Sequence, residues 1–230
     1  MKVHIWSDFV CPFCYAGTEN LYKAIKEFKE EHDVDFDIEY MSYVLNPDAK
    51  YVEGETYMES LAKSRGLDEA TTKQMTQQTQ AIARSAGLEY DMENMKTSNT
   101  MDAHRVYHYA KAEGKGIDFY TRLYKAIFEE GAVVEHHDVL VALAEDIGLD
   151  AEAVREVLDN DETNHNAVIQ DVVLAQQVGV SGVPFFVFEG KYAISGAQPK
   201  EQFLGLITAV EDGSLAEQYA QEADQETAEE

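Results

Sequence analysis

The chain has two cysteines, which lie close together near the N-terminus in the stretch FVCPFCY at residues 9–15. Cys11 and Cys14 could form half of a metal site, a structural disulfide, or a pair that opens and closes during catalysis. A structural zinc site needs four ligands, and the sequence has no second cysteine pair. Metal binding is therefore the weaker alternative, and we expect no metal site. No local spacing marks any histidine as a further ligand among His4, His104, His108, His136 and His137.

The residues that surround the pair favour redox chemistry. Residues 2–7 (KVHIWS) are predicted to form a strand, and apolar residues recur at helical spacing from Cys11 to about residue 30. Cys11 would then begin a helix, where free N–H groups and the helix dipole stabilise a thiolate. Pro12 suits the first helical turn because its missing N–H has no partner there. The sequence predicts that Cys11 attacks a disulfide and that Cys14 resolves the mixed disulfide.

The elements that must position this pair lie at both ends of the chain. Alternating residues 34–42 and a hairpin at 183–195 predict strands, and 199–212 predicts a closing helix. Nearly everything from about 56 to 178 is predicted to be helical. The stop and start signals are Gly66, Asp68, Gly87, Thr100 or Asp102, Asp118, Asp138 and Asp150. We predict an α/β domain from residues 1–48 and 179–213. A helical domain, 49–178, is inserted into it, its last helix leads back to the sheet, and an acidic tail, 214–230, follows.

Composition narrows the classes of partner. The chain has 44 acidic and 18 basic residues, a formal net charge of −26. Such a surface repels phosphate backbones and anionic membranes, so we expect neither nucleic acid nor membrane as a partner. The acidity itself suits solubility in a saline or alkaline setting. No secretory signal or membrane span is recognisable, so we expect a cytoplasmic protein, and a reducing cytosol disfavours a permanent disulfide.

Two distant stretches carry a family resemblance. SDFVCPFCYAG at residues 7–17 and GVSGVPFFVFEGKYAISGAQP at 179–199 resemble the thioredoxin-fold DsbA family. The closer match is its cytoplasmic FrnE-like branch, which includes relatives of 2-hydroxychromene-2-carboxylate isomerase. LNP at 45–47 and NTMDAHRVYHYA at 99–110 also look like that branch. The resemblance covers about residues 1–212, and it implies a thioredoxin fold interrupted by a helical domain.

The resemblance also implies roles for residues outside the pair. Val183–Pro184 matches the family's cis-proline, and the backbone of Val183 would pair with a substrate chain as an added strand. Asn99, His104 and Arg105 match a signature on an inserted helix that would face the cysteines. A cation there could favour the Cys11 thiolate or hold an acidic substrate group. The alternative roles are a helix cap for Asn99, a core position for His104 and a structural ion pair for Arg105.

Two positions depart from the family pattern. Thioredoxin and DsbA have a buried carboxylate six residues before the first cysteine, where it can relay the proton of the second thiol. Here Ile5 occupies that position, and Asp8 is expected in a loop, so water or another group would take the proton of Cys14. Phe13 stands where DsbA has histidine and cannot donate a hydrogen bond to the thiolate. We therefore expect Cys11 to be less acidic than in DsbA and the protein to be a weaker oxidant.

Three functions follow from these features. The first is a thiol–disulfide oxidoreductase for protein or small-molecule disulfides, with a thiol reductant or oxidant as partner and Pro12 and Phe13 beside the substrate. It would need no bound cofactor, with glutathione as a candidate co-substrate. A cytosolic poise of roughly −220 to −320 mV favours the dithiol at rest and reduction or isomerisation as the reaction. The second is a glutathione-dependent isomerase, although those enzymes usually have serine in place of the first cysteine. The third is chaperone-like binding of unfolded chains along Phe13, Val183 and Phe185.

Overall fold

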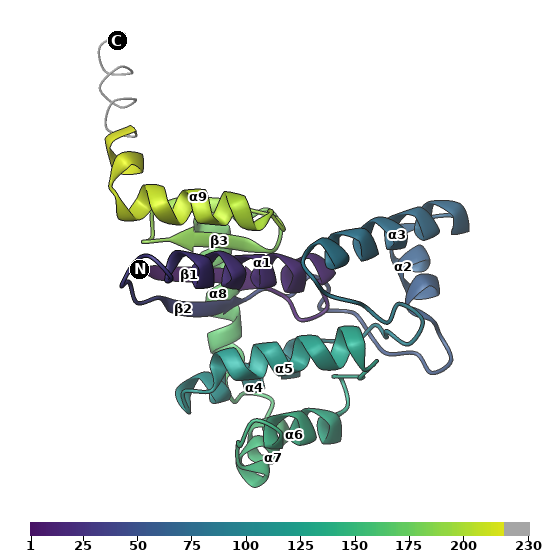
Figure 1. Ribbon diagram of the computed structural model, residues 1–230. Helices are drawn as coiled ribbons and strands as arrows, with labels where there is room; N and C mark the ends of the chain where they lie inside the picture. The colour runs from purple at the N-terminus through teal and green to yellow at the C-terminus, as the bar shows by residue number, and fades with distance from the viewer. Residues whose placement is uncertain (219–230) are drawn as a thin grey trace.

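The computed structural model describes residues 1–218, and its centre is a four-stranded mixed sheet (Figure 1). The strands lie in the order β2-β1-β3-β4. β1 is parallel to β2 and antiparallel to β3, which is antiparallel to β4. The strands are β1 Lys2–Ser7, β2 Asp37–Ser42, β3 Phe185–Phe188 and β4 Tyr192–Ser195. The predicted α/β fold, with strands contributed by both ends of the chain, is confirmed.

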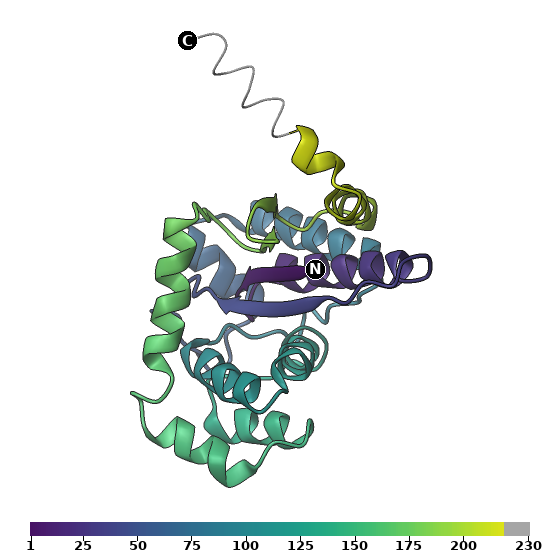
Figure 2. The same cartoon turned by 90° about the vertical axis from the view of Figure 1, so that its left-hand side faces the viewer.

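Helices cover both faces of this sheet. α1 (Pro12–Phe28) and α9 (Lys200–Glu211) pack against each other on one face, and α8 (His165–Gln177) runs along the opposite side in Figure 2. The residues of β1 alternate accordingly. Val3 and Ile5 join the core on the α1 side, whereas Trp6 packs with α8 and donates its indole N–H to the Asp171 carbonyl at 3.1 Å. β1 is therefore a central strand that is buried on both faces.

The chain between β2 and β3 is helical. Its first pair, α2 and α3, lies apart from the other inserted helices in Figure 1, with α3 against α1, whereas α4 and α5 pack beneath β2. One hydrophobic core runs from the sheet into α4–α7. Within it, the ring of Tyr40 on β2 stacks on Tyr120 with centroids 3.8 Å apart. The helices are α2 Tyr57–Arg65, α3 Glu69–Ser85, α4 Met101–Ala112, α5 Gly116–Glu129, α6 His137–Glu145, α7 Ala151–Asp159 and α8.

The ends of these helices agree in part with the predicted signals. Gly66 ends α2 in the left-handed conformation, with φ 63°. Asp68 and Asp150 accept backbone N–H bonds at the starts of α3 and α7. Asp118 and Asp138 are not caps, because α5 and α6 begin before them, at residues 116 and 137. In that position an acidic side chain still favours the positive end of the helix dipole.

Two predicted segments differ at their ends. The second strand was expected from residue 34, but it begins at Asp37, whose N–H bonds to the carbonyl of Met1 at the start of the sheet. The acidic tail is helical over residues 214–218, and residues 219–230 lie outside the described part of the chain. Among residues 1–218, no helix is both long and apolar enough to cross a membrane.

Candidate active site

The loop after β1 places the cysteine pair at the start of α1. Cys11 is the residue before the helix, with an extended backbone, and Pro12 takes the first helical position. The N–H of Cys14 bonds to the carbonyl of Cys11 at 3.0 Å, which closes the first turn. Both thiols are free, and the two residues approach to 3.1 Å. The spacing and the proline thus bring the two sulfurs onto one side of the first turn.

The second stretch that carried the resemblance lies directly against this turn. The Val183–Pro184 peptide bond is cis, as the resemblance implied. The Cys11 thiol donates to the carbonyl of Val183, with the sulfur and oxygen 3.7 Å apart. Gly17 permits this close approach, because a Cβ at residue 17 would lie 3.1 Å from the Pro184 ring and 3.2 Å from the Cα of Ala197. The structure therefore brings Cys11, Val183 and Pro184 together.

The two thiols have different surroundings. Cys11 is 3% exposed and lines a cavity, whereas Cys14 is fully buried. Burial raises the pKa of Cys14 well above its ordinary value, and the neighbouring Cys11 raises it further. The side chain of Ser7 and the backbone of Asp8 act in the opposite direction and lower the pKa of Cys14. This asymmetry suits an outer thiol that meets substrate and an inner thiol that acts second.

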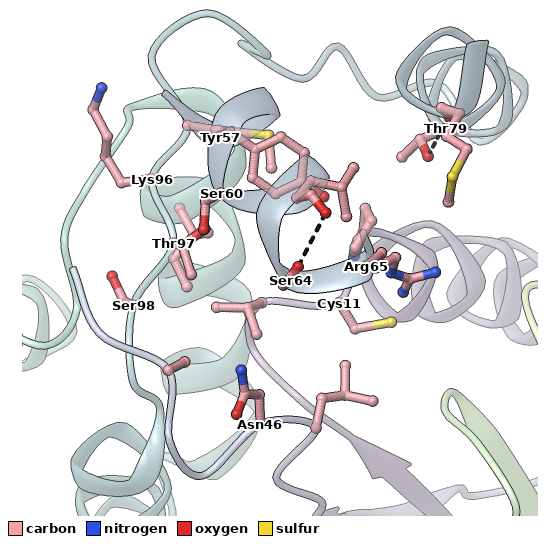
Figure 3. Close-up of a pocket in the computed structure, with 18 of the residues that line it drawn as sticks. Cys11, Asn46, Tyr57, Ser60, Ser64, Arg65, Thr79, Lys96, Thr97 and Ser98 are labelled. Carbon is pink, nitrogen blue, oxygen red and sulfur yellow. Dashed lines mark hydrogen bonds between the residues drawn. The ribbon is translucent and has the colours of Figure 1, made fainter. Parts of the chain in front are cut away.

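The cavity in front of Cys11 has a volume of about 870 Å³ (Figure 3). Pro12, Phe13 and Val183 line it beside Cys11, and Phe13 is 38% exposed. The opposite wall comes from α2, α3 and the segments that flank them, including Tyr57 and Arg65. The cavity thus joins the residues near the cysteine pair to the first two inserted helices, with room for a tripeptide or a peptide loop.

Basic residues outnumber acidic residues in the cavity lining, whereas the whole chain is strongly acidic. Lys50, Lys63, Arg65 and Lys96 line it, whereas the acidic lining residues are Asp48 and Glu55. The Lys63 ammonium pairs with Glu55, and the other three cations form no ion pair within residues 1–218. A lining with unpaired cations in a chain of net charge −26 is suited to an anionic ligand.

Tyr57 lies between the charged wall and the cysteine. The pKa of Tyr57 is raised to about 12, mainly by burial and also by a nearby Cys11 thiolate, while Arg65 acts in the opposite direction. The Tyr57 hydroxyl is therefore within electrostatic reach of both groups and stays protonated at neutral pH. Figure 3 shows Tyr57, Arg65 and Cys11 around the same space, with Lys96 directed away.

Asn99 and Arg105 lie away from the cysteine pair. The side-chain amide of Asn99 donates to the carbonyl of Pro47 at 2.8 Å and so holds the loop after β2. Arg105 is 1% exposed, and its guanidinium donates to Asp102 at 2.6 Å and to the Thr163 carbonyl at 2.9 Å. Neither residue lines the large cavity. These positions favour the alternative structural roles over contact with substrate.

His104 is also fully buried, but its surroundings are unusual. Its Nε2 lies 3.5 Å from a carboxylate oxygen of Asp8, which is fully buried as well. Neither ring nitrogen of His104 has a hydrogen-bond partner within residues 1–218. The other Asp8 oxygen accepts the N–H of Leu45 at 2.7 Å, so this carboxylate holds the β1–α1 loop against the loop after β2. His104 thus reaches the loop beneath the cysteines and does not reach the cavity.

Comparison with known proteins decides the family. Residues 2–208 match the family described as the DSBA-like thioredoxin domain. The chain belongs to this family. The DsbA-like protein is 31% identical over 213 residues to the uncharacterized protein YwbO of Bacillus subtilis (strain 168), an alignment that covers 88% of this chain and 94% of YwbO. Its thioredoxin-like fold and its membership of a family of thiol oxidoreductases are thereby established.

Solved structures agree with this assignment. A probable DsbA oxidoreductase from Streptomyces coelicolor is 32% identical, with a TM-score of 0.82, and the match covers 90% of this chain and 88% of the other. The cytosolic disulfide reductase DsbM from Pseudomonas aeruginosa has a TM-score of 0.64 at 17% identity, covering 92% and 99%. A 2-hydroxychromene-2-carboxylate isomerase has the same TM-score and identity, covering 96% and 98%. The last two share the fold of the DsbA-like protein.

Several residues of the DsbA-like site are absent from the sequence-based prediction. Ser7, Tyr57, Arg65 and Tyr124 all lie near the cysteine pair in space, and three of them are distant from it in the chain. No motif marks Tyr57 or Arg65. Ser7 had a signal, because it ends a central strand shortly before Cys11, but its partner Tyr124, 117 residues away, could not be foreseen.

Proposed function

We propose that the protein is a thiol–disulfide oxidoreductase in which Cys11 is the attacking thiolate and Cys14 the resolving thiol. The observation that carries this proposal is the pair of free thiols 3.1 Å apart, one facing a cavity of about 870 Å³ and the other fully buried. A substrate disulfide can therefore reach Cys11 alone. The resulting mixed disulfide lies next to Cys14, which can displace the substrate.

The proposed direction is reduction or isomerisation of substrate disulfides in the cytoplasm. A cytosolic poise of roughly −220 to −320 mV keeps most such pairs reduced, so each turnover would start from the dithiol. Protein disulfides and small disulfides are both candidate substrates, and the backbone of Val183 would align an extended chain beside Cys11. The similarity in fold to a cytosolic disulfide reductase agrees with this direction.

The cations of the cavity support a small acidic thiol as co-substrate. Lys50 and Arg65 line the cavity without a carboxylate partner in the described chain, and glutathione carries a carboxylate at each end. The DsbM structure has also been solved with glutathione. A glutathione-dependent isomerase of small molecules would need only the thiol of glutathione, whereas this site keeps two protein thiols within reach of each other. The isomerase and a chaperone-like role are therefore the weaker proposals.

A redox titration tests the proposal. Equilibration with mixtures of reduced and oxidised dithiothreitol should give one two-electron transition, read as loss of two alkylatable thiols. Cys11→Ser should abolish the transition and the reduction of a protein disulfide such as that of insulin. Cys14→Ser should instead trap a mixed disulfide on Cys11. The proposal is wrong if Cys11 and Cys14 form no disulfide at any accessible potential.

A further inference from the structure

The buried Cys14 has to lose its proton in a place that opposes ionisation. Its side chain is fully buried, and burial raises the pKa of Cys14 well above the ordinary value. The side chain six residues before Cys11, where related proteins keep a carboxylate, is Ile5, which is fully buried in the apolar core. Some other group must stabilise the Cys14 thiolate during the second step of the reaction.

Two hydroxyl groups, those of Ser7 and Tyr124, lie near the Cys14 sulfur. The side chain of Ser7, the last residue of β1, lies close enough to the Cys14 thiol to lower its pKa. The Ser7 hydroxyl also forms a short hydrogen bond with the hydroxyl of Tyr124 on α5. Ser7 is fully buried and Tyr124 is 1% exposed, so water does not compete for these bonds. The Ser7 and Tyr124 hydroxyls thus form a buried hydrogen-bonded pair next to the Cys14 sulfur.

The order of donors along this line follows from the number of protons available. Each hydroxyl donates one hydrogen bond and can accept others. When Cys14 is a thiolate it can only accept, so Ser7 donates to the sulfur and Tyr124 donates to Ser7. When Cys14 is a thiol, the two bonds can reverse. Hydrogen bonds in such a chain polarise one another, and a charged end strengthens each of them in a buried setting.

We propose that Ser7 and Tyr124 form a hydroxyl relay that stabilises the thiolate of Cys14 while it resolves the mixed disulfide. The inference deepens the proposed function and rests on it. Ser7 is then a catalytic residue, because it touches the reacting sulfur, and Tyr124 is a positioning residue that orients the Ser7 hydroxyl. The backbone N–H of Asp8 is a second donor to the same sulfur.

The step balances without any further reagent. The mixed disulfide consists of substrate sulfur bonded to Cys11. Cys14 gives up its proton, and its thiolate attacks the Cys11 sulfur. The bond between Cys11 and Cys14 forms while the bond to the substrate breaks. The substrate leaves as a thiolate and takes up one proton, so the two electrons of the dithiol end on the substrate.

The other groups around Cys14 do not replace this relay. Tyr120 directs its hydroxyl to the backbone carbonyl of Ser7, at 3.4 Å. The carboxylate of Asp8 is held by the N–H of Leu45 and lies beside His104. Cys11 is bonded to the substrate in the mixed disulfide and therefore has no proton to donate. The hydroxyls of Ser7 and Tyr124 are therefore the side-chain donors that remain for the Cys14 thiolate within the described residues.

Single-turnover kinetics test the relay. The substrate is a small aromatic disulfide whose released thiol is coloured, and acid quenching with alkylation counts mixed disulfide and free thiol separately. Tyr124→Phe removes one oxygen and keeps the ring, and Ser7→Ala removes the direct donor. Both should slow resolution by about ten- to a hundredfold, the loss expected for a hydrogen bond to a charged group. Attack by Cys11 should keep its wild-type rate, so mixed disulfide accumulates.

The pH profile separates the relay from a merely structural role. The rate of resolution should rise with pH, because the Cys14 pKa lies above neutrality, and both variants should move the rise to higher pH. Tyr15→Phe is the matched control. Its ring stacks on Tyr124 at 4.9 Å, but its hydroxyl bonds to Glu129 at 3.0 Å, away from the cysteines. In this variant the mixed disulfide should be resolved at the wild-type rate, with the wild-type dependence on pH.

The outcomes distinguish this inference from the proposed function. If wild-type protein forms no mixed disulfide, the proposed function fails and the relay fails with it. If wild-type protein turns over and Tyr124→Phe resolves at the wild-type rate and pH, the relay alone is wrong. A slower rate in Tyr15→Phe equal to that in Tyr124→Phe also overturns it, because ring packing would then explain the effect. Should Ser7→Ala not fold, Tyr124→Phe decides the question.

Discussion

The helices inserted between β2 and β3 form two parts that are packed in opposite ways. In the first part, α2 buries none of its side chains, and α3 buries only Thr72, Thr76 and Ala83. In the second part, α4 and α5 carry much of the core. Their buried residues are Ala103, His104, Arg105, Val106, Tyr107 and Ala110 on α4, and Phe119, Tyr120, Leu123, Tyr124, Ala126, Ile127 and Phe128 on α5.

The two parts lie mainly against different members of the cysteine pair, although Ile127 of α5 also lines the cavity. α2 and α3 line the cavity in front of Cys11, and α5 supplies Tyr120 and Tyr124 next to Cys14. Segments with few buried apolar contacts open at lower free energy than the core. The wall in front of Cys11 is therefore freer to adapt, whereas the surroundings of Cys14 are held rigid. An adaptable wall suits disulfides of several shapes.

The largest expected effect is a difference in the free energy of unfolding between alanine variants of two leucines. Leu123 on α5 is fully buried, and Leu61 on α2 is half-buried at the cavity wall. Leu123→Ala should lower the free energy of unfolding by about 2–5 kcal/mol, because it leaves a cavity in the core. Leu61→Ala should lower it by less than about 1 kcal/mol. Chemical denaturation measures both, and equal losses would contradict the comparison.

The second largest expected effect is the loss of stability when Arg105, the buried cation on α4, is replaced. The Arg105 guanidinium bonds to Asp102, to the Thr163 carbonyl and to the carbonyls of Val157 and Asn160. Arg105→Met leaves these acceptors without their donor and should cost roughly 2–3 kcal/mol of stability. Because Arg105 does not line the cavity, KM for an acidic disulfide should stay unchanged at a temperature where the variant is folded.

The control for that substitution is Arg155→Met on α7. Arg155 is exposed, and its ion pair with Asp138 lies on the surface, so this variant should lose less than about 1 kcal/mol. A rise in KM in Arg105→Met with no loss of stability would contradict the structural role. It would instead support the prediction, made from the family resemblance, that Arg105 binds substrate.

The sequence predicted the elements around the cysteines because local rules decide them. A short apolar-rich run marked β1, alternation marked β2, the Glu189–Gly190 turn marked the β3–β4 hairpin, and some glycine and aspartate signals marked ends of helices. The same rules brought the two cysteines to the start of α1. Such features depend on residues that are near one another in the chain, so periodicity and turn chemistry suffice.

The side chains that surround the pair could not be predicted in the same way. His104 and Arg105 belong to one motif, but their burial depends on how α4 packs against the sheet and the loop before α8. Tyr124 meets Ser7 across 117 residues, and Arg65 reaches the cavity only because α2 lies over it. These contacts follow from packing between distant elements, which no single sequence reveals without its fold.

The smallest effect belongs to the exposed cation of the adaptable part. Arg65 is the last residue of α2, lines the cavity, and forms no ion pair within residues 1–218. Arg65→Gln should raise KM for oxidised glutathione about three- to tenfold, the effect of roughly 1 kcal/mol of lost attraction. The effect should shrink as salt rises, since ions screen an exposed charge. A neutral disulfide such as hydroxyethyl disulfide should keep its KM.

Arg155→Gln makes the same change in net charge on a helix remote from the cavity and controls for the field of the whole molecule. It should leave KM for both disulfides at the wild-type value, and neither variant should lose more than about 1 kcal/mol of stability. If Arg65→Gln and Arg155→Gln raise KM equally, the general charge of the protein governs binding. If only Arg65→Gln does so, the loosely packed wall recognises the charge of the substrate.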